Sequence, residues 1–111
     1  MHFLEEDQFV MRIYVRQGDK HNGRAVYHEI IDLLHDENAE GVTVFRGIAG
    51  FGHGSKVRSS SLLALSKDLP IVIEVVDNEE KIASLKPKIE ETFVNGLITL
   101  QKVHAAMYVR Q

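Results

Sequence analysis

The 111-residue sequence contains no cysteine. Disulfide bonds, thiolate metal sites and cysteine nucleophiles are therefore excluded. No apolar run approaches the roughly 18 residues that a membrane-spanning helix needs. The first residues include Glu5, Glu6 and Asp7, where a secretory signal peptide would carry positive charge. We therefore expect a cytoplasmic protein that does not insert into a membrane.

A basic excess is also missing. The formal net charge is -3, whereas general nucleic-acid binders usually carry an excess of Lys and Arg, so no nucleic-acid partner is predicted. The charges are unevenly spread, however. No acid occurs between Gly41 and Lys67, and the bases of this segment are Arg46, Lys56, Arg58 and Lys67. Unless the clustering is accidental, the segment indicates a local site for an anion.

Hydrophobic periodicity predicts the first half of the fold. Residues 9–16 alternate between apolar and polar, which is typical of a strand. Asn22-Gly23 then opens a predicted helix that ends at Gly41 and has apolar residues at helical spacing. A second strand is expected over residues 42–49. The apolar residues of the helix are Tyr27, Ile30, Ile31 and Leu34.

The second half repeats this order. Residues 69–76 form a third predicted strand, in which Pro70 is tolerable only at the start or on an edge. Asp77 and Glu80 resemble a capping box at the start of a second helix, and Pro87 predicts a kink or a restart within it. Two short extended pieces follow, over residues 97–100 and 103–109. The apolar stripe of this helix is Ile82, Leu85, Ile89 and Phe93.

The resulting order, β-α-β-β-α-β, predicts an α+β fold of the ferredoxin-like type. We expect a single domain over residues 1–111, with a four-stranded antiparallel sheet, two helices on one face and a long loop between strands two and three. The third predicted strand is apolar on both faces. Since no further helix is available to cover the second face, self-association is the simplest way to cover it.

The long loop begins with "RGIAGFGHGSKVRSSS", residues 46–61. A Walker P-loop requires Gly-Lys followed directly by Ser or Thr, but here Ser55 separates Gly54 from Lys56. The dinucleotide-binding spacing of glycines is absent too. A glycine-rich turn can still bind an anion through its backbone N–H groups, and Arg can clamp phosphate oxygens. The alternative is that the segment only connects two strands.

Other chemistries have weaker support in the sequence. The six histidines do not show metal-ligand spacing, so no metal site is predicted. Glu74 lies within an apolar stretch and is either an acid of raised pKa or, more often in such a position, one half of an ion pair. Asp19-Lys20 is typical of a turn, or alternatively lines a subunit junction. No catalytic residue is assigned, and we expect a protein that is not an enzyme.

Three segments together resemble a known family. "TVFRGIAGFGHGSKVRSSSLLALSKDLPIVIEVVDNEEKI" (residues 43–82), "RIYVRQGDKHNGRAVYHEII" (12–31) and "GLITLQKV" (96–103) resemble the PII-like signalling proteins once catalogued as a domain of unknown function. The resemblance implies a ferredoxin-like protomer in a homotrimer, as in nitrogen-regulatory PII and CutA proteins. In PII relatives, an adenine nucleotide binds between subunits, with its phosphates near the loop that corresponds to residues 47–67.

This resemblance assigns roles to the loop. Arg46, Lys56 and Arg58 would bind phosphates, and Phe51 would stack on the base or pack against the protein. The glycines would allow close approach of the backbone; these are Gly47, Gly50 and Gly52. Residues 47–67 contain no tyrosine for uridylylation, and Asn95-Gly96 is followed by no base until Lys102. AMP, ADP and ATP therefore all remain candidate ligands.

The implied function is a sensor that binds an adenine nucleotide as a ligand, without another cofactor, and regulates a protein partner through the loop 47–67. The partner is unidentified, and a membrane protein would satisfy the description. Two alternatives stay open. One is a structural or metal-responsive trimer of the CutA kind. The other is a weak nucleotide-processing enzyme that uses Glu74 or His53 as its acid-base group.

Overall fold

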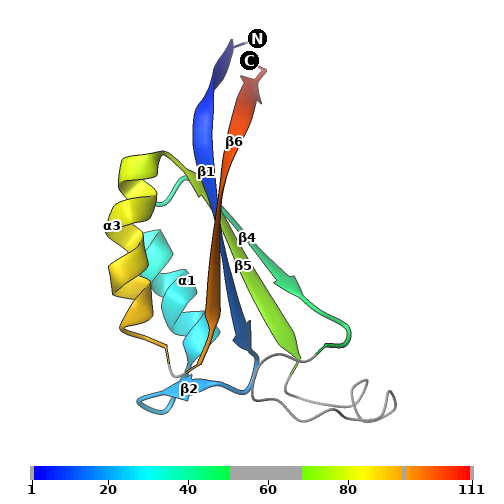
Figure 1. Ribbon diagram of the computed structural model, residues 1–111, viewed down its shortest axis with the longest axis vertical. Helices are drawn as coiled ribbons and strands as arrows, with labels where there is room; N and C mark the ends of the chain where they lie inside the picture. The colour runs from blue at the N-terminus through cyan, green and yellow to red at the C-terminus, as the bar shows by residue number, and fades with distance from the viewer. Residues whose placement is uncertain (1, 51–68, 94, 111) are drawn as a thin grey trace.

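The computed structural model describes residues 2–50, 69–93 and 95–110, with side chains from Leu4 onward. Two helices lie against one face of a sheet, and a small two-stranded hairpin lies below them (Figure 1). The elements are β1 (His2–Arg16), β2 (Lys20–His21), β3 (Arg24–Ala25), α1 (Val26–Asp36), β4 (Gly41–Arg46), β5 (Pro70–Asp77), α3 (Glu79–Glu90) and β6 (Leu97–Val109).

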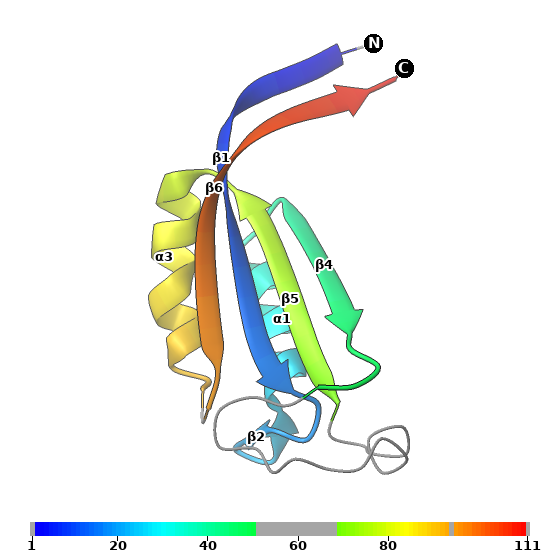
Figure 2. The ribbon, with the colours of Figure 1, turned by 45° about the vertical axis from the view of Figure 1, so that its right-hand side comes forward.

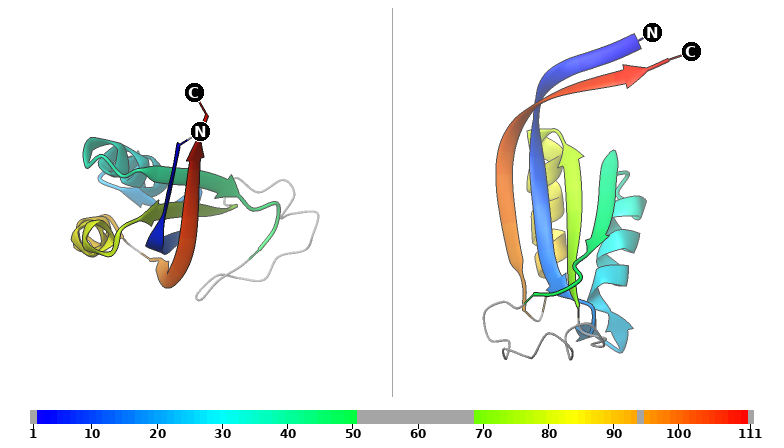
Figure 3. Two further views of the ribbon diagram at one scale, coloured as in Figure 1. Left: turned by 90° about the horizontal axis from the view of Figure 1, so that it is seen from above. Right: turned by 90° about the vertical axis from the view of Figure 1, so that its right-hand side faces the viewer.

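The main sheet has four strands in the order β4-β5-β1-β6, and every neighbouring pair is antiparallel. This order and the two helices on one face confirm the ferredoxin-like prediction (Figures 1 and 3). β5 and β1 are the central strands. Pro70, which has no N–H to donate, is the first residue of β5, as the sequence required.

The core lies between the helices and the sheet. Alternate residues of β1 and β5 point toward the helices, because side chains of a strand alternate between its faces. Each helix contributes one stripe at a spacing of three or four residues, and Tyr27, Ile31 and Phe93 pack at the margin of the core. The buried residues of this core are Met11, Ile13, Val15, Val26, Ile30, Leu34, Ile71, Ile73, Val75, Ile82, Leu85 and Ile89.

The first helix begins later than predicted. Asn22 and Gly23 do not open the helix but form the turn between β2 and β3, and α1 starts at Val26. Both turn residues have positive φ, 51° and 80° respectively. Asn-Gly is the pair that a two-residue hairpin of this kind favours. The local preference of Asn-Gly for a hairpin therefore prevails over its use as a helix start.

The second half of the chain differs from the prediction in three respects. β4 ends at Arg46 rather than at residue 49, and α3 continues through Pro87 to Glu90, so the restart is not observed. Asn78 caps α3, since its side-chain oxygen accepts the N–H of Lys81 at 2.8 Å. Asp77 is buried instead, and it accepts the backbone N–H groups of Asn78 at 2.8 Å and Glu40 at 3.1 Å.

The last two predicted pieces are one strand. β6 pairs with β1 from Tyr14↔Leu97 to His2↔Val109, although β5 pairs with β1 only from Phe9 onward. Residues 2–8 and 103–109 therefore continue past the rest of the sheet as a two-stranded terminal arm, which bends over the ends of β5 and β4 (Figures 2 and 3). The sequence does not predict the first part of β1, because Glu5, Glu6 and Asp7 interrupt the alternation of apolar and polar residues.

Candidate functional site

The glycine-rich loop leaves the sheet at the end opposite the terminal arm (Figure 2). Two backbone hydrogen bonds close its base: Gly47 donates to Pro70 and Gln17 donates to Leu69, both at 2.8 Å. A Cβ atom would lie 2.8 Å from the Pro70 ring if added at Gly47, and 3.1 Å if added at Gly50. Glycine therefore lets residues 47–50 cross closely over the end of β5 toward β1 (Figures 2 and 3).

Arg46 is the last residue of the edge strand β4, directly before this crossing. Its side chain is exposed and makes no ion pair or hydrogen bond with the part of the chain that the structure describes. Arg46, Gly47 and Gly50 thus lie at one end of the sheet, and their role in binding an anion stays a prediction. The other predicted site residues lie outside the described residues and stay predictions; they are Phe51, Gly52, Lys56, Arg58 and the alternative acid-base group His53.

The small hairpin of β2 and β3 lies at the same end, between β1 and α1 (Figure 1). It is fastened to the helix at its base, where Val26 donates to the carbonyl of Asp19 at 2.9 Å. Along the helix, His21 bonds Glu29 and Arg24 bonds Asp32, both at 2.9 Å. The hairpin is therefore held in place by the helix. We call this end of the sheet, with residues 46–50, the start of β5 and the hairpin, the loop end.

The face of the sheet opposite the helices has no covering element within the described residues (Figure 3). Strand register brings Phe45, Val72, Tyr14 and Leu97 side by side on it, and we call this set the apolar row. Tyr14, Phe45 and Leu97 are 36%, 50% and 56% exposed. A row of large apolar side chains left this accessible is typical of an interaction surface.

Glu74 lies on the same face, beside the apolar row. Its carboxylate accepts a hydrogen bond from Arg12 Nε at 3.0 Å, and Arg12 also donates to Gln101 at 3.2 Å. The ion-pair interpretation of Glu74 is confirmed. The carboxylate of Glu74 is thus engaged by a guanidinium on the open face of the sheet.

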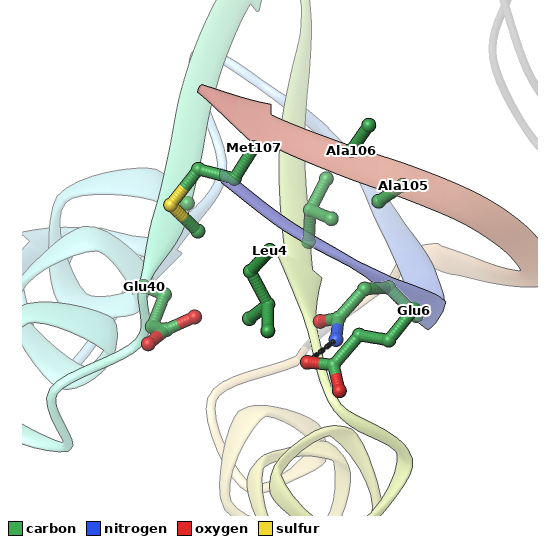
Figure 4. Close-up of a pocket in the computed structure, with 9 residues that line it drawn as sticks. Leu4, Glu6, Glu40, Ala105, Ala106 and Met107 are labelled. Atoms are coloured by element: carbon green, nitrogen blue, oxygen red, sulfur yellow. Dashed lines mark hydrogen bonds between the residues drawn. The ribbon is translucent and has the colours of Figure 1, made fainter. Parts of the chain in front are cut away.

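A hollow of about 240 Å³ lies under the terminal arm, at the far end from the glycine-rich loop. Leu4 and Met107 point into it, and Glu6 and Glu40 stand at its rim (Figure 4). Neither carboxylate makes an ion pair with the described residues. An apolar hollow with unneutralised acids at its rim repels phosphate, so the anion site predicted from the sequence does not belong here.

The arm also carries a histidine held between two carboxylates. His104 Nε2 lies 2.7 Å from Glu5 and its Nδ1 lies 3.3 Å from Asp7, which also pairs with Lys102 at 3.3 Å. These hydrogen bonds, that of Glu5 first, raise the pKa of His104 above its ordinary value. The hydrogen bond from His104 in turn lowers the pKa of Asp7.

The raised pKa of His104 gives a testable dependence of stability on pH. Protonated His104 stabilises the folded arm fully below the pKa of an unfolded histidine, and this contribution is lost as pH rises through the higher folded pKa. We expect the stability advantage of the wild type over His104→Gln to be larger at about pH 6 than at about pH 9. Urea unfolding of both proteins at one concentration measures it; equal differences at the two pH values would contradict the expectation.

Neither a membrane-spanning helix nor a cluster of metal ligands occurs in the described residues. Neither helix has the length and the continuous apolar character that crossing a membrane would require. Residues 2–50, 69–93 and 95–110 also contain no group of three or more metal-ligating side chains placed to share an ion.

Comparisons with known proteins give consistent matches. The model of the DUF190 family of uncharacterized proteins matches residues 8–105. A UPF0166 protein of Methanocaldococcus jannaschii is 40% identical over 96 residues, which are 86% of this chain and 88% of that protein. A UPF0166 protein of Aquifex aeolicus is 36% identical over 94 residues, 85% of this chain and 89% of the relative.

Solved structures resemble the fold. CPII of Thiomonas intermedia K12, a nitrogen regulatory PII-like protein bound to ADP, AMP and bicarbonate, has a TM-score of 0.67 at 15% identity, covering 96% of this chain and 100% of that chain. A PII-like signaling protein of Thermus thermophilus has a TM-score of 0.62 at 12% identity, covering 91% of both chains. At these identities the likeness concerns the fold alone.

Proposed function

Since this chain belongs to the DUF190 (UPF0166) family, whose model spans residues 8–105, we propose that it is a PII-like sensor that binds an adenine nucleotide at the interface between subunits. The fold it shares with CPII, which binds ADP and AMP, supports this proposal. The observation that carries it lies at the loop end. Arg46, whose side chain has no partner among the described residues, lies next to two glycines that pass close to Pro70, and these groups offer charge and backbone N–H to a phosphate group.

The assembly we propose is a homotrimer in which the open sheet faces meet. The apolar row supports it, because a single chain leaves Tyr14, Phe45 and Leu97 at least one third exposed. Covering such side chains contributes about 25 cal/mol for each Å² of apolar surface removed from water. The trimer also brings copies of the loop end close together, which a ligand bound between subunits requires.

The proposed role is regulatory and not enzymatic. Phosphates bound by Arg46, Lys56 and Arg58 would order the loop 47–67, which otherwise costs about 1–2 kcal/mol per residue to fix. Gly47, Gly50 and Gly52 would allow close approach, and Phe51 would stack on the base or pack. A protein partner would then bind the ordered loop. We propose that residues 1–111 act as one domain in the cytoplasm, where adenine nucleotides are available.

Calorimetric titration with AMP, ADP and ATP tests this function. We expect micromolar binding of at least one nucleotide, weakened about tenfold or more in Arg46→Ala, because a charge-assisted hydrogen bond to phosphate is lost. Arg110→Ala is the matched control, since it removes the same charge at the arm end. Absence of binding by an intact wild-type trimer would contradict the proposal and favour a purely structural assembly.

A further inference from the structure

Four cations of the described residues lie at or near the loop end, and their partners differ. Arg16 bonds Asp19, and Arg24 bonds Asp32. The side chain of Lys20 is exposed and, like that of Arg46, makes no hydrogen bond or ion pair with the described part of the chain. From residue 19 to residue 32, each acid is already bonded, namely Asp19, Glu29 and Asp32. Among the described residues at this end, Lys20 and Arg46 are therefore the cations whose side chains have no bonded partner.

Backbone contacts connect these two residues through the ends of three strands. Arg16 pairs with Pro70, and Gln17 donates to Leu69 at 2.8 Å. Gly47, next to Arg46, donates to the carbonyl of Pro70 at 2.8 Å. Because only β5 separates β4 from β1, the backbones of Arg46 and Arg16 are about 10 Å apart, two strand spacings. Lys20 follows Arg16 by one tight turn.

The hairpin that carries Lys20 is built more firmly than a connection requires. Strand-to-helix connections commonly need about 2–6 residues, whereas the connection over residues 17–25 contains a hairpin, β2 and β3, of its own. The Asn22-Gly23 turn, the Val26–Asp19 hydrogen bond and the His21–Glu29 bond hold it against α1. A side chain on such a fixed ribbon loses less freedom when it binds a ligand.

We propose that Lys20 is a further anion-binding residue of this site, beside Arg46, so that the ligand carries at least two phosphate groups. This inference rests on the proposed function, and it restricts the ligand to a nucleoside di- or triphosphate. Arg46 ends the strand on one side of β5, and Lys20 follows the strand on its other side. One phosphate cannot engage both as well as two linked phosphates can. Lys20 acts as a point charge on the outer phosphate, and Arg46 as a bidentate clamp on the inner one.

Titrations with ADP, AMP and inorganic pyrophosphate test this inference. In Lys20→Ala we expect affinity for ADP and pyrophosphate to fall about tenfold and affinity for AMP to change less than threefold, because AMP lacks the outer phosphate. Lys20→Arg, which keeps the charge, should retain most of the affinity. Lys81→Ala removes the same charge near the opposite end of β5 and should bind as the wild type. Unchanged thermal unfolding shows that each variant is folded.

The outcomes separate this inference from the proposed function. If the wild type binds ADP and Lys20→Ala binds it equally well, the role of Lys20 is wrong and the nucleotide site stands. If pyrophosphate binds in a way that depends on Lys20 but ADP binds no more tightly than pyrophosphate, the role of Lys20 is supported and the proposed recognition of adenine is wrong. If neither ADP nor pyrophosphate binds the wild type, both proposals are overturned.

Discussion

Replacing Tyr14 by aspartate is expected to convert the proposed trimer into monomers. Tyr14 lies in the middle of the apolar row, paired with Val72 on one side and Leu97 on the other. Burying a carboxylate among apolar side chains without a partner costs several kcal/mol, and a trimer would bury three of them. Arg12 lies two residues away on the same face, but it is already bonded to Glu74 and Gln101.

Light scattering after size-exclusion chromatography measures this change directly. Tyr14→Phe is the matched control, since it keeps the ring and adds no charge, and it should remain assembled. Circular dichroism should show that Tyr14→Asp retains its helices, because the ring faces away from the core between helices and sheet. A Tyr14→Asp protein that keeps the mass of the wild-type assembly would show that the apolar row is not an interface.

Replacing Asp77 by alanine is expected to lower the free energy of unfolding by about 3 kcal/mol, because hydrogen bonds to a buried charged group are among the stronger ones. Asp77 is only 2% exposed. One carboxylate oxygen accepts the N–H of Asn78, and the other accepts the N–H of Glu40. The side chain thereby joins the end of β5 to the segment between α1 and β4. Alanine would leave both donors without this partner.

Urea unfolding at a single protein concentration measures the loss, since the stability of an oligomer depends on concentration. Asp77→Asn is the informative control. It has nearly the same shape and keeps one acceptor oxygen, so it should lose clearly less stability than alanine does. A loss below about 1 kcal/mol in Asp77→Ala would mean that water replaces the carboxylate at both donors.

Most of the fold could be predicted because its signals are local. The alternation of residues 9–16 and 69–76 and the stripe of Ile82, Leu85 and Ile89 follow from the faces that strands and helices bury. The errors arose where two local preferences competed. Asn22-Gly23 suits both a helix boundary and a hairpin turn, and Asp77 and Asn78 both suit an N-cap. Only tertiary contacts decided between them.

The terminal arm was missed for a different reason. Residues 2–8 become a strand because β6 pairs with them, and no property of that short acidic stretch predicts so distant a partner. His104 compensates for two of its acids, Glu5 and Asp7, across the pair of strands. Charge pairs between two strands can be recognised only when the pairing register of the strands is known.

The sequence indicates where the proposed anion site lies, but not which residues from other elements border it. Glycine spacing and the absence of acids are enough to locate Arg46, Gly47 and Gly50 in the sequence. The importance of Lys20 depends on Arg16 and Arg24 being neutralised by Asp19 and Asp32, and a sequence does not reveal those pairings. The same holds for Glu74, whose partner Arg12 is 62 residues away. Which cations remain unneutralised is a property of the fold.

The pairing of His2 with Val109 has a practical consequence for handling the protein. Both ends of the described chain lie side by side at the tip of the terminal arm, away from the loop end (Figure 1). An affinity tag or a tether to a sensor chip can therefore be attached at either terminus while the opposite end still faces the solution. Immobilised in this way, the protein is suited to screening for nucleotides and for the partner on the same surface.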